Sequence, residues 1–315
     1  NLLTQTATLM MLAMALVFVI LLGEIDLSAG VTSGVTASVF VVLVHNVQMN
    51  WILALLIAFA VGLAIGTFIG FFVARVGIPS FVVTLGLFLG FQGLQLLIIG
   101  TGGAYRIETP EISAIMNKNL PILWGWIFLA VAIAVDLGIS LWDRARRKRA
   151  GVINRPITLM WIRVGALAVG GALFVALMSV DRAAGRGTLN GVPIAHDVIE
   201  GVPIVVPIAL FLLWAGTFIL DRTRYGRHLY AVGGNGEAAR RAGIKVAAIR
   251  MSAFMVCSTL AVVAGLFDAR RHGHGSRHGK VRGALVRHVS DVEIDVRALG
   301  EVVPGAEHIA RGIVR

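Results

Sequence analysis

The chain has 315 residues, of which 57% are hydrophobic and only 14% are charged. Soluble domains average about 45–50% apolar and about 25% charged residues, so this composition excludes an ordinary soluble domain and indicates an integral membrane protein. The net charge of +11 favours membrane topology and anionic lipid over nucleic acid, because the cations flank apolar segments without interleaved aromatic residues. The single cysteine, Cys257, predicts neither a disulfide framework nor a thiolate metal site.

Eight uncharged apolar segments follow one another along the chain. Segments of about 17 residues or more can cross the hydrocarbon core as helices, whereas the two shorter ones need their flanks or a re-entrant geometry. None alternates with a period of two, which argues against an outer-membrane barrel. We therefore predict an all-α, polytopic bundle of about eight transmembrane helices, with Val31–Val44 the weakest span. The segments are Leu2–Leu22, Val31–Val44, Trp51–Ala74, Phe81–Ile99, Ile122–Val135, Val164–Val180, Val202–Leu220 and Met251–Phe267.

The interruption at Gly23–Gly30 places two carboxylates, Glu24 and Asp26, between apolar runs that are otherwise uncharged up to Ala74. A carboxylate at membrane depth costs about 2.5–3.5 kcal/mol on insertion scales, so its presence indicates a functional site or a break. The glycines permit positive φ and predict a helix break. Asp26 either has a functional role or caps a helix that begins near Ser28, and both can hold.

Polar side chains in two later segments have alternative uses. Gln92 and Gln95 share one helix face, where their neutral amides can hydrogen-bond a solute that passes through the membrane. Interhelical hydrogen bonding, worth about 0.6 kcal/mol per bond, is the other use. Asp136 lies six residues before Trp142, and solvation near the cytoplasmic interface is expected for it rather than a proton relay.

Most of the Lys and Arg residues before the C-terminal tail fall in two loops, Asp143–Arg163 and Asp221–Arg250. The positive-inside rule places both loops in the cytoplasm. Alternation then puts Gly100–Pro121 and Asp181–Gly201 outside. It puts Gly23–Gly30 toward the cytoplasm if its flanking segments are separate spans.

The loop before the last apolar segment predicts a Gly-rich turn followed by a short helix. Glu237 follows the Gly/Asn start, alanines favour helix, and Gly243 suits the position just after a helix end. Small side chains would let another protein approach the backbone closely, while a solvated connector is an equal alternative.

The tail from Asp268 to Arg315 has a different composition. It contains no Phe, Trp, Tyr, Met or Cys but five of the eight histidines. Low hydrophobicity and high charge predict disorder. Metal binding through His272, His274 and His278 is a weak alternative because no carboxylate or Cys partner lies at a matching spacing. The start at Asn1, rather than Met, indicates a truncation within a longer chain.

Three stretches together resemble the permease subunits of bacterial ribose/xylose-type sugar ABC importers. They are Glu24–Gly30, Pro79–Gly86 and Tyr230–Val246, and the resemblance covers roughly Asn1 to Leu266. Glu24 and the basic loop Asp143–Arg163 are most similar to xylose-type permeases. The family often has an Arg where this chain has Gln92.

The resemblance ends near Leu266, where such permeases continue with a Gly-rich acidic segment and further helices. We therefore expect a permease domain over 1–267 and a non-matching tail over 268–315. We hypothesise a reading-frame change near Asp268–Arg271, so that shifting the frame of the coding DNA around Arg270 should reveal an apolar continuation.

The resemblance implies a transport subunit with no catalytic residue, metal or cofactor. Its implied partners are a cytoplasmic sugar ABC ATPase, a periplasmic or lipid-anchored sugar-binding protein, a second permease copy and membrane lipid. The chain itself lacks a Gly-x-x-x-x-Gly-Lys-Ser/Thr phosphate loop, which agrees with ATP hydrolysis on the partner.

The resemblance also implies site residues. The expected ATPase-coupling residues are Gly233, Gly234, Asn235, Glu237, Ala238, Ala239, Arg240 and Gly243. The candidates for the translocation pathway are Glu24, Asp26, Ser28, Gln92 and Gln95. An ion-coupled secondary transporter is the alternative function, in which Glu24, Asp26 and Asp136 would carry the coupling charge.

Overall fold

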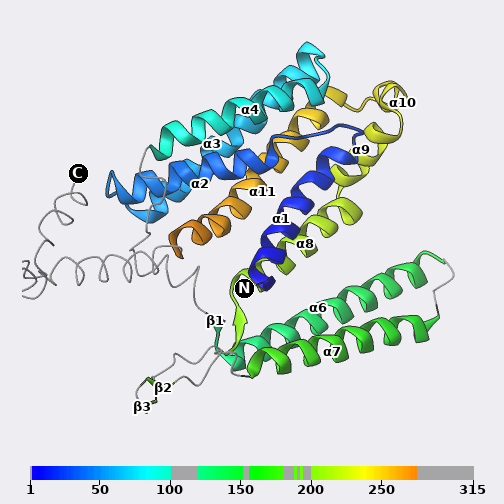
Figure 1. Ribbon diagram of the computed structural model, residues 1–315. Helices are drawn as coiled ribbons and strands as arrows, with labels where there is room; N and C mark the ends of the chain where they lie inside the picture. The colour runs from blue at the N-terminus through cyan, green and yellow to red at the C-terminus, as the bar shows by residue number, and fades with distance from the viewer. Residues whose placement is uncertain are drawn as a thin grey trace, which may run out of the picture. The chain divides into compact units, whose positions relative to one another are not determined.

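The computed structural model describes residues 2–100, 119–151, 156–180, 188–189, 192–193 and 200–274; of 188–189, 192–193 and 268–274 it describes only the backbone. Helices dominate this part of the chain (Figure 1). The helices are α1 (Leu2–Ile20), α2 (Ala29–His45), α3 (Trp51–Phe71), a π-helical turn η1 (Phe72–Val76), α4 (Ser80–Ile99), α6 (Ile122–Arg149), α7 (Ile157–Ser179), α8 (Val205–Arg222), α9 (Arg224–Gly234), α10 (Gly236–Arg241) and α11 (Val246–His274).

Seven of the described helices are long and apolar enough to cross a membrane, and α2 is a shorter apolar helix. These helices confirm the predicted all-α, polytopic class. The described strands form two antiparallel pairs, and each strand has two residues. One joins β1 (Asn119–Leu120) to β4 (Val202–Pro203), with Asn119 opposite Pro203, and the other joins β2 (Thr188–Leu189) to β3 (Val192–Pro193). The predicted disorder of the tail 268–315 is wrong for 268–274, which continue α11, and the rest of that tail lies outside the described residues.

Two boundaries differ from the sequence expectation. Helix α6 continues to Arg149 instead of ending at Val135, and α7 begins at Ile157 instead of near Val164. The charged residues Asp143–Arg149 and Arg163, which suggested a loop, are therefore helical. Asp136 on α6 forms an ion pair with Arg163 on α7, which corrects the expectation that Asp136 is simply solvated.

A row of small residues brings α3 against α11. Ala54, Ala58, Gly62, Gly66 and Gly70 recur every four residues along α3, and all five are buried. A Cβ added at Gly66 would lie 2.6 Å from the Phe254 carbonyl oxygen and 2.7 Å from the Met255 Cα. The two backbones thus approach as closely as in other small-xxx-small helix pairs in membranes.

We expect the variant Gly66→Ala to be destabilised by about 1–3 kcal/mol, because the new methyl group meets the α11 backbone, which cannot rotate away. Thermal unfolding in detergent measures this loss. The matched control is Gly86→Ala on α4, where an added Cβ meets nothing within 4 Å. Equal melting temperatures for the two variants would contradict the close packing of α3 on α11.

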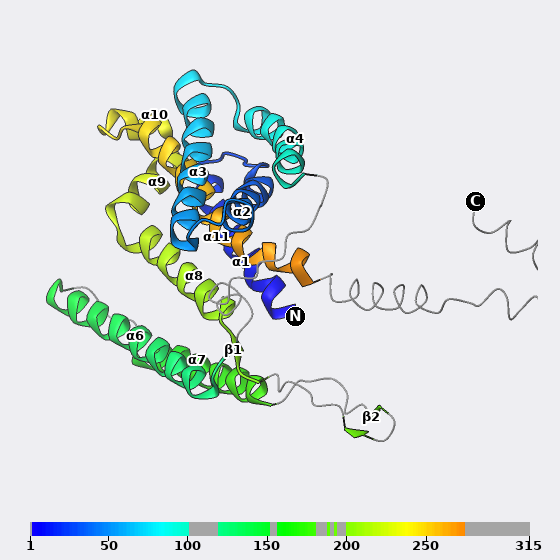
Figure 2. The same ribbon diagram turned by 90° about the vertical axis from the view of Figure 1, so that its left-hand side faces the viewer.

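A second contact positions the short helices near the end of α1. Helices α1 and α8 lie side by side, and α9 and α10 follow α8 (Figures 1 and 2). A Cβ at Gly233 of α9 would lie only 3.3 Å from the Leu22 Cα, so α9 packs on the last turn of α1. One buried cluster connects these elements; it consists of Met14, Phe18, Leu22, Leu220, Leu229, Val232, Ala239 and Ala253.

Helices α6 and α7 form an antiparallel hairpin, which both views show side by side (Figures 1 and 2). In each of the two helices, only 11% of an apolar stretch of 18 residues is buried. An ion pair between Asp143 of α6 and Arg222 of α8 links the hairpin to the rest of the unit, with both carboxylate oxygens accepting from the guanidinium.

Candidate functional site

The chain between α1 and α2 is not helical. Helix α1 ends at Ile20, a turn follows up to Gly23, which has a φ of +74°, and α2 begins at Ala29. The residue is glycine because of this positive φ and not because of crowding, since an added Cβ would meet nothing within 4 Å. We call Glu24–Leu27 the extended segment. Its non-helical backbone needs hydrogen-bond partners from the protein if it lies at membrane depth.

The first turns of α4 supply those partners. The Ile25 N–H donates to the Ser80 hydroxyl at 3.0 Å, and the Leu27 N–H donates to the Thr84 hydroxyl at 3.2 Å. The Thr84 oxygen also lies 2.9 Å from the Ser80 carbonyl and 3.3 Å from the Ile25 carbonyl, the two acceptors for its proton. Both hydroxyl residues are buried. Their spacing of four residues puts them on one helix face, along which the segment runs.

The two carboxylate side chains of the extended segment both contact other residues. Asp26 is only 7% exposed. Its Oδ1 accepts from the Ser28 N–H at 2.9 Å and from the Ser28 hydroxyl at 2.7 Å, and its Oδ2 lies 3.6 Å from the Cys257 sulfur. The carboxylate therefore binds Ser28, the residue that precedes α2, while α2 itself has no side-chain cap hydrogen bond, so the capping role of Asp26 stays a prediction.

Glu24 makes an ion pair with Arg250 in the second turn of α11, at 3.6 Å between Oε1 and Nε. The Glu24 side chain is 15% exposed and that of Arg250 is 37% exposed. The buried Arg250 Nε lacks a hydrogen-bond partner. The pair is thus an electrostatic contact without a hydrogen bond at this atom, and it ties the extended segment to the start of α11.

The glutamines lie elsewhere. The Gln95 side chain packs on α2, where its Oε1 would be 2.6 Å from a Cβ at Gly34. Gln92 is exposed. Gln95 follows Thr84 by eleven residues, or roughly 16 Å of helix. The structure therefore brings Glu24, Asp26 and Ser28 together but not the five predicted pathway residues as one cluster.

Two buried hydroxyls were missed by the sequence reasoning. The Oγ1 of Thr32 on α2 and the Oγ of Ser258 on α11 are fully buried without a hydrogen-bond partner. The sequence does show that Thr32 and Ser258 are hydroxyl residues inside apolar segments. It does not show which of the hydroxyl residues in such segments lack a hydrogen-bond partner. Among the described residues, no group of three His, Cys, Asp or Glu could hold a metal ion.

The loop before α11 forms a short exposed hook, Asn235–Gly243. Asn235 caps α10, since its Oδ1 accepts from the Ala238 N–H at 2.9 Å, and Gly243 has a φ of +84°, as expected for the residue after a helix end. The predicted Gly-rich turn is corrected here. Gly233 and Gly234 belong to α9, and the break between the helices is Asn235 alone.

One predicted contact residue of the hook points inward. Ala239 is 4% exposed and belongs to the cluster that packs on α1. Its expected contact with a partner therefore does not fit this geometry, and its packing role explains the small side chain. Glu237, Ala238 and Arg240 are exposed, and Glu237 pairs with Arg240 at 2.7 Å.

We expect Thr84→Val to lower the free energy of unfolding by about 1–3 kcal/mol, because the variant leaves the Leu27 N–H without an acceptor. Thermal unfolding in detergent measures the change. The matched control is Thr67→Val, whose hydroxyl donates to the Leu63 carbonyl of its own helix. If both variants melt alike, Thr84 does not hold the extended segment.

Comparisons with known proteins agree with the resemblance. The family model described as "Branched-chain amino acid transport system / permease component" matches residues 1–277. The xylose transport system permease protein XylH of Escherichia coli K12 is 33% identical over 278 residues, 88% of this chain and 65% of that protein. XylH of Haemophilus influenzae is 29% identical over 281 residues, and the ribose import permease protein RbsC of Escherichia coli K12 is 39% identical over 71 residues, 22% of either chain.

The chain thus spans 65% of the length of the Escherichia coli xylose permease. No solved structure matches it. The named relatives are transport permeases rather than enzymes. The family match extends to residue 277, so the boundary between 267 and 268 stays a prediction. The chain belongs to the family of branched-chain amino acid transport system permease components and is a multi-pass protein of the bacterial inner membrane.

Proposed function

We propose that this chain is the membrane-spanning permease subunit of an ATP-driven sugar importer, with a pentose of the xylose type as cargo. The observation that carries the proposal is the position of the hook. Its buried side packs on the end of α1, directly before the extended segment, while Glu237, Ala238 and Arg240 face outward. A partner that pushes on α10 acts on the residues that lead into this segment.

Two contacts support the transmission of such a push. Gly233 lets α9 lie against the last turn of α1 without an intervening side chain. Arg250, which follows the hook by seven residues, pairs with Glu24. The two elements that flank the hook therefore reach this region: α9 meets Leu22, just before the extended segment, and α11 pairs with Glu24 within it. Because packed interiors resist deformation, a shift of the hook moves these elements together.

The chemistry of the interior suits a neutral cargo. A sugar offers hydroxyl groups, which amides and hydroxyls bind without a fixed charge. Gln95, Thr32 and Ser258 supply such groups, and Thr32 and Ser258 have atoms without a partner. Asp26, Ser28, Glu24 and Gln92 complete the proposed pathway residues. Weak contacts of this kind favour release as well as entry.

The proposed partners follow from the same division of work. The hook docks on a cytoplasmic ATPase, and the sugar arrives from a periplasmic or lipid-anchored binding protein. A second copy of the permease completes the pathway. The resemblance to xylose permeases supports this assembly.

An ion-coupled secondary transporter fits the geometry less well. Its coupling carboxylates would be Glu24, Asp26 and Asp136, and each of them is engaged by another group. Glu24 pairs with Arg250, Asp136 pairs with Arg163, and Asp26 accepts from Ser28. Reconstitution with an ion gradient separates the two functions, since a secondary carrier transports alone whereas a permease is inert without its ATPase and binding protein.

We expect Ala238→Trp to abolish capture of the purified importer ATPase, at a loss of about tenfold or more in affinity, because the indole blocks close backbone approach at the hook. Pull-down on immobilised permease measures the binding. The control is Ala150→Trp, an exposed alanine after α6. Undiminished capture, above all after scrambling residues 233–244, would refute the role of the hook.

We expect Asp26→Asn, introduced at the matching position of a full-length relative, to lower coupled sugar uptake with little loss of membrane insertion. The amide oxygen still accepts from the Ser28 N–H, so the fold is retained while the charge is lost. Uptake of labelled xylose at matched expression is the measurement. Normal uptake would leave Asp26 with its capping role alone.

A further inference from the structure

The α6–α7 hairpin is joined to α8 by backbone and packing at the end where both α6 and α8 begin. The strand β1, which leads into α6, pairs with β4, which leads into α8 (Figures 1 and 2). The Asn119 side-chain amide donates to the Glu200 carbonyl at 2.9 Å. The buried Val202 of β4 lies beside Gly125 of α6, where an added Cβ would be 3.4 Å from the Val202 Cγ2. We call the strand pair β1–β4 the hinge.

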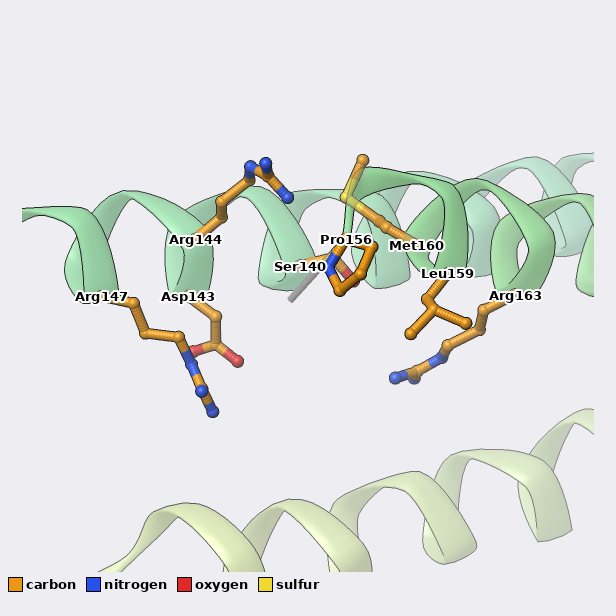
Figure 3. Close-up of a pocket in the computed structure, with 8 residues that line it drawn as sticks. All are labelled: Ser140, Asp143, Arg144, Arg147, Pro156, Leu159, Met160 and Arg163. Carbon is orange, nitrogen blue, oxygen red and sulfur yellow. The ribbon is translucent and has the colours of Figure 1, made fainter. Parts of the chain in front are cut away.

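The opposite end of the hairpin is joined to α8 through side chains. Both carboxylate oxygens of Asp143 on α6 accept hydrogen bonds from the guanidinium of Arg222 on α8. Figure 3 shows the Asp143 side chain pointing out of the hairpin, toward α8, whereas Arg144 points to the other side. A bidentate pair fixes orientation as well as distance. The side chains of Arg222 and Asp143 are 35% and 28% exposed, so water and salt ions reach the pair.

Between the hinge and this pair, packing holds the hairpin only weakly. In each of its two helices, 11% of an apolar stretch is buried. Lipid tails are as apolar as these side chains, so a hairpin that parts from α8 exposes no apolar surface to water. From Ile122 to Asp143, α6 covers roughly 32 Å. Over this length a small rotation at the hinge separates Asp143 from Arg222.

Asp143 has a second cation within reach on its own helix. Arg147 follows it by four residues, and Figure 3 shows both side chains on the same side of α6. Acidic and basic side chains at this spacing interact on a helix surface. When the hairpin leaves α8, Arg147 therefore compensates part of the Asp143 charge. This alternative partner brings the docked and the undocked arrangement closer in free energy, as a switch between two states requires.

Arg222 lies at the base of the segment that carries the hook. It is the last residue of α8, and Thr223, directly after it, caps α9 by accepting from the Gly226 N–H at 3.2 Å. Helix α9 then packs on Leu22 and leads into the hook. A contact that docks Arg222 on the hairpin therefore orients the end of α8, from which α9 and the hook continue.

We propose that the Asp143–Arg222 pair is an ionic latch, which keeps the hairpin docked on α8 at low ionic strength and opens as the ionic strength rises. Salt screens exposed ion pairs, because the Debye length falls from about 8 Å at physiological salt to about 3 Å at about 1 M. Opening turns the hairpin about the hinge and frees the end of α8. The consequence for transport, a looser connection between the hook and the ATPase stroke, rests on the proposed function; the latch itself does not.

Distances between two spin labels test the latch on the purified full chain in lipid nanodiscs. The labels are attached to Ala150→Cys, after α6, and to His228→Cys on α9; both positions are exposed, whereas the native Cys257 is fully buried. We expect a short, narrow distance distribution in about 0.05 M salt and a longer, broader one in about 1 M salt. Asp143→Asn should raise the open fraction in low salt about two- to fivefold, as the strength of partly exposed ion pairs implies.

Charge reversal separates the pair from the net charge of this end of the hairpin. Asp143→Arg and Arg222→Asp should each open the latch in low salt. The two substitutions together should close it again and restore its response to salt. The matched control is Asp221→Asn, which removes the same charge directly beside Arg222 and should leave the distance distribution unchanged.

Three results would overturn the proposal. A distribution in the unsubstituted chain that does not respond to salt, or one that Asp143→Asn leaves unchanged, would show that the pair does not hold the hairpin. A double reversal as open as the single ones, or equal opening by Asp221→Asn, would assign the effect to net charge. The salt titration needs no substitution in the pair, so a variant that fails to fold does not end the test. Neither ATPase nor sugar is present, so a failed latch leaves the proposed function to its own pull-down and uptake measurements.

Discussion

The rest of the arrangement depends on how the extended segment satisfies its backbone. A stretch without helical hydrogen bonds is tolerated inside a membrane protein only when the protein supplies partners. Ser80 and Thr84 do so for Ile25 and Leu27. These bonds fix the first turns of α4 beside the segment, which in turn sets where α2 begins. The buried Asp26 completes the join through the N–H and hydroxyl of Ser28.

Close helix contacts built from small residues place the other elements around this segment. The Ala and Gly row of α3 admits the α11 backbone, and Gly233 admits the end of α1 to α9. In lipid, where burial of apolar surface drives association only weakly, such close packing supplies much of the stability. The same contacts place α9, which leads into the hook, against Leu22, just before the extended segment.

The α6–α7 hairpin follows a different rule. Its helices pack mainly on each other, and its described polar contacts are ion pairs, Asp136 with Arg163 and Asp143 with Arg222. Ion pairs at a membrane surface weaken in salt and orient a helix less firmly than packing does.

The sequence by itself determined the membrane class, the helical spans, the break at Gly23–Gly30 and the short helix after Asn235, because apolar run length, glycine and capping chemistry act locally. It also identified the family, since three stretches agree in order and spacing. Only the tertiary structure decided that Ser80 and Thr84 hold the extended segment, that Ala239 faces inward, that Asp136 finds Arg163, and that Gln92 lies apart from Asp26. These outcomes depend on which distant helix packs against a residue. A side chain's own chemistry states what partner it needs, but not which one the fold brings within reach.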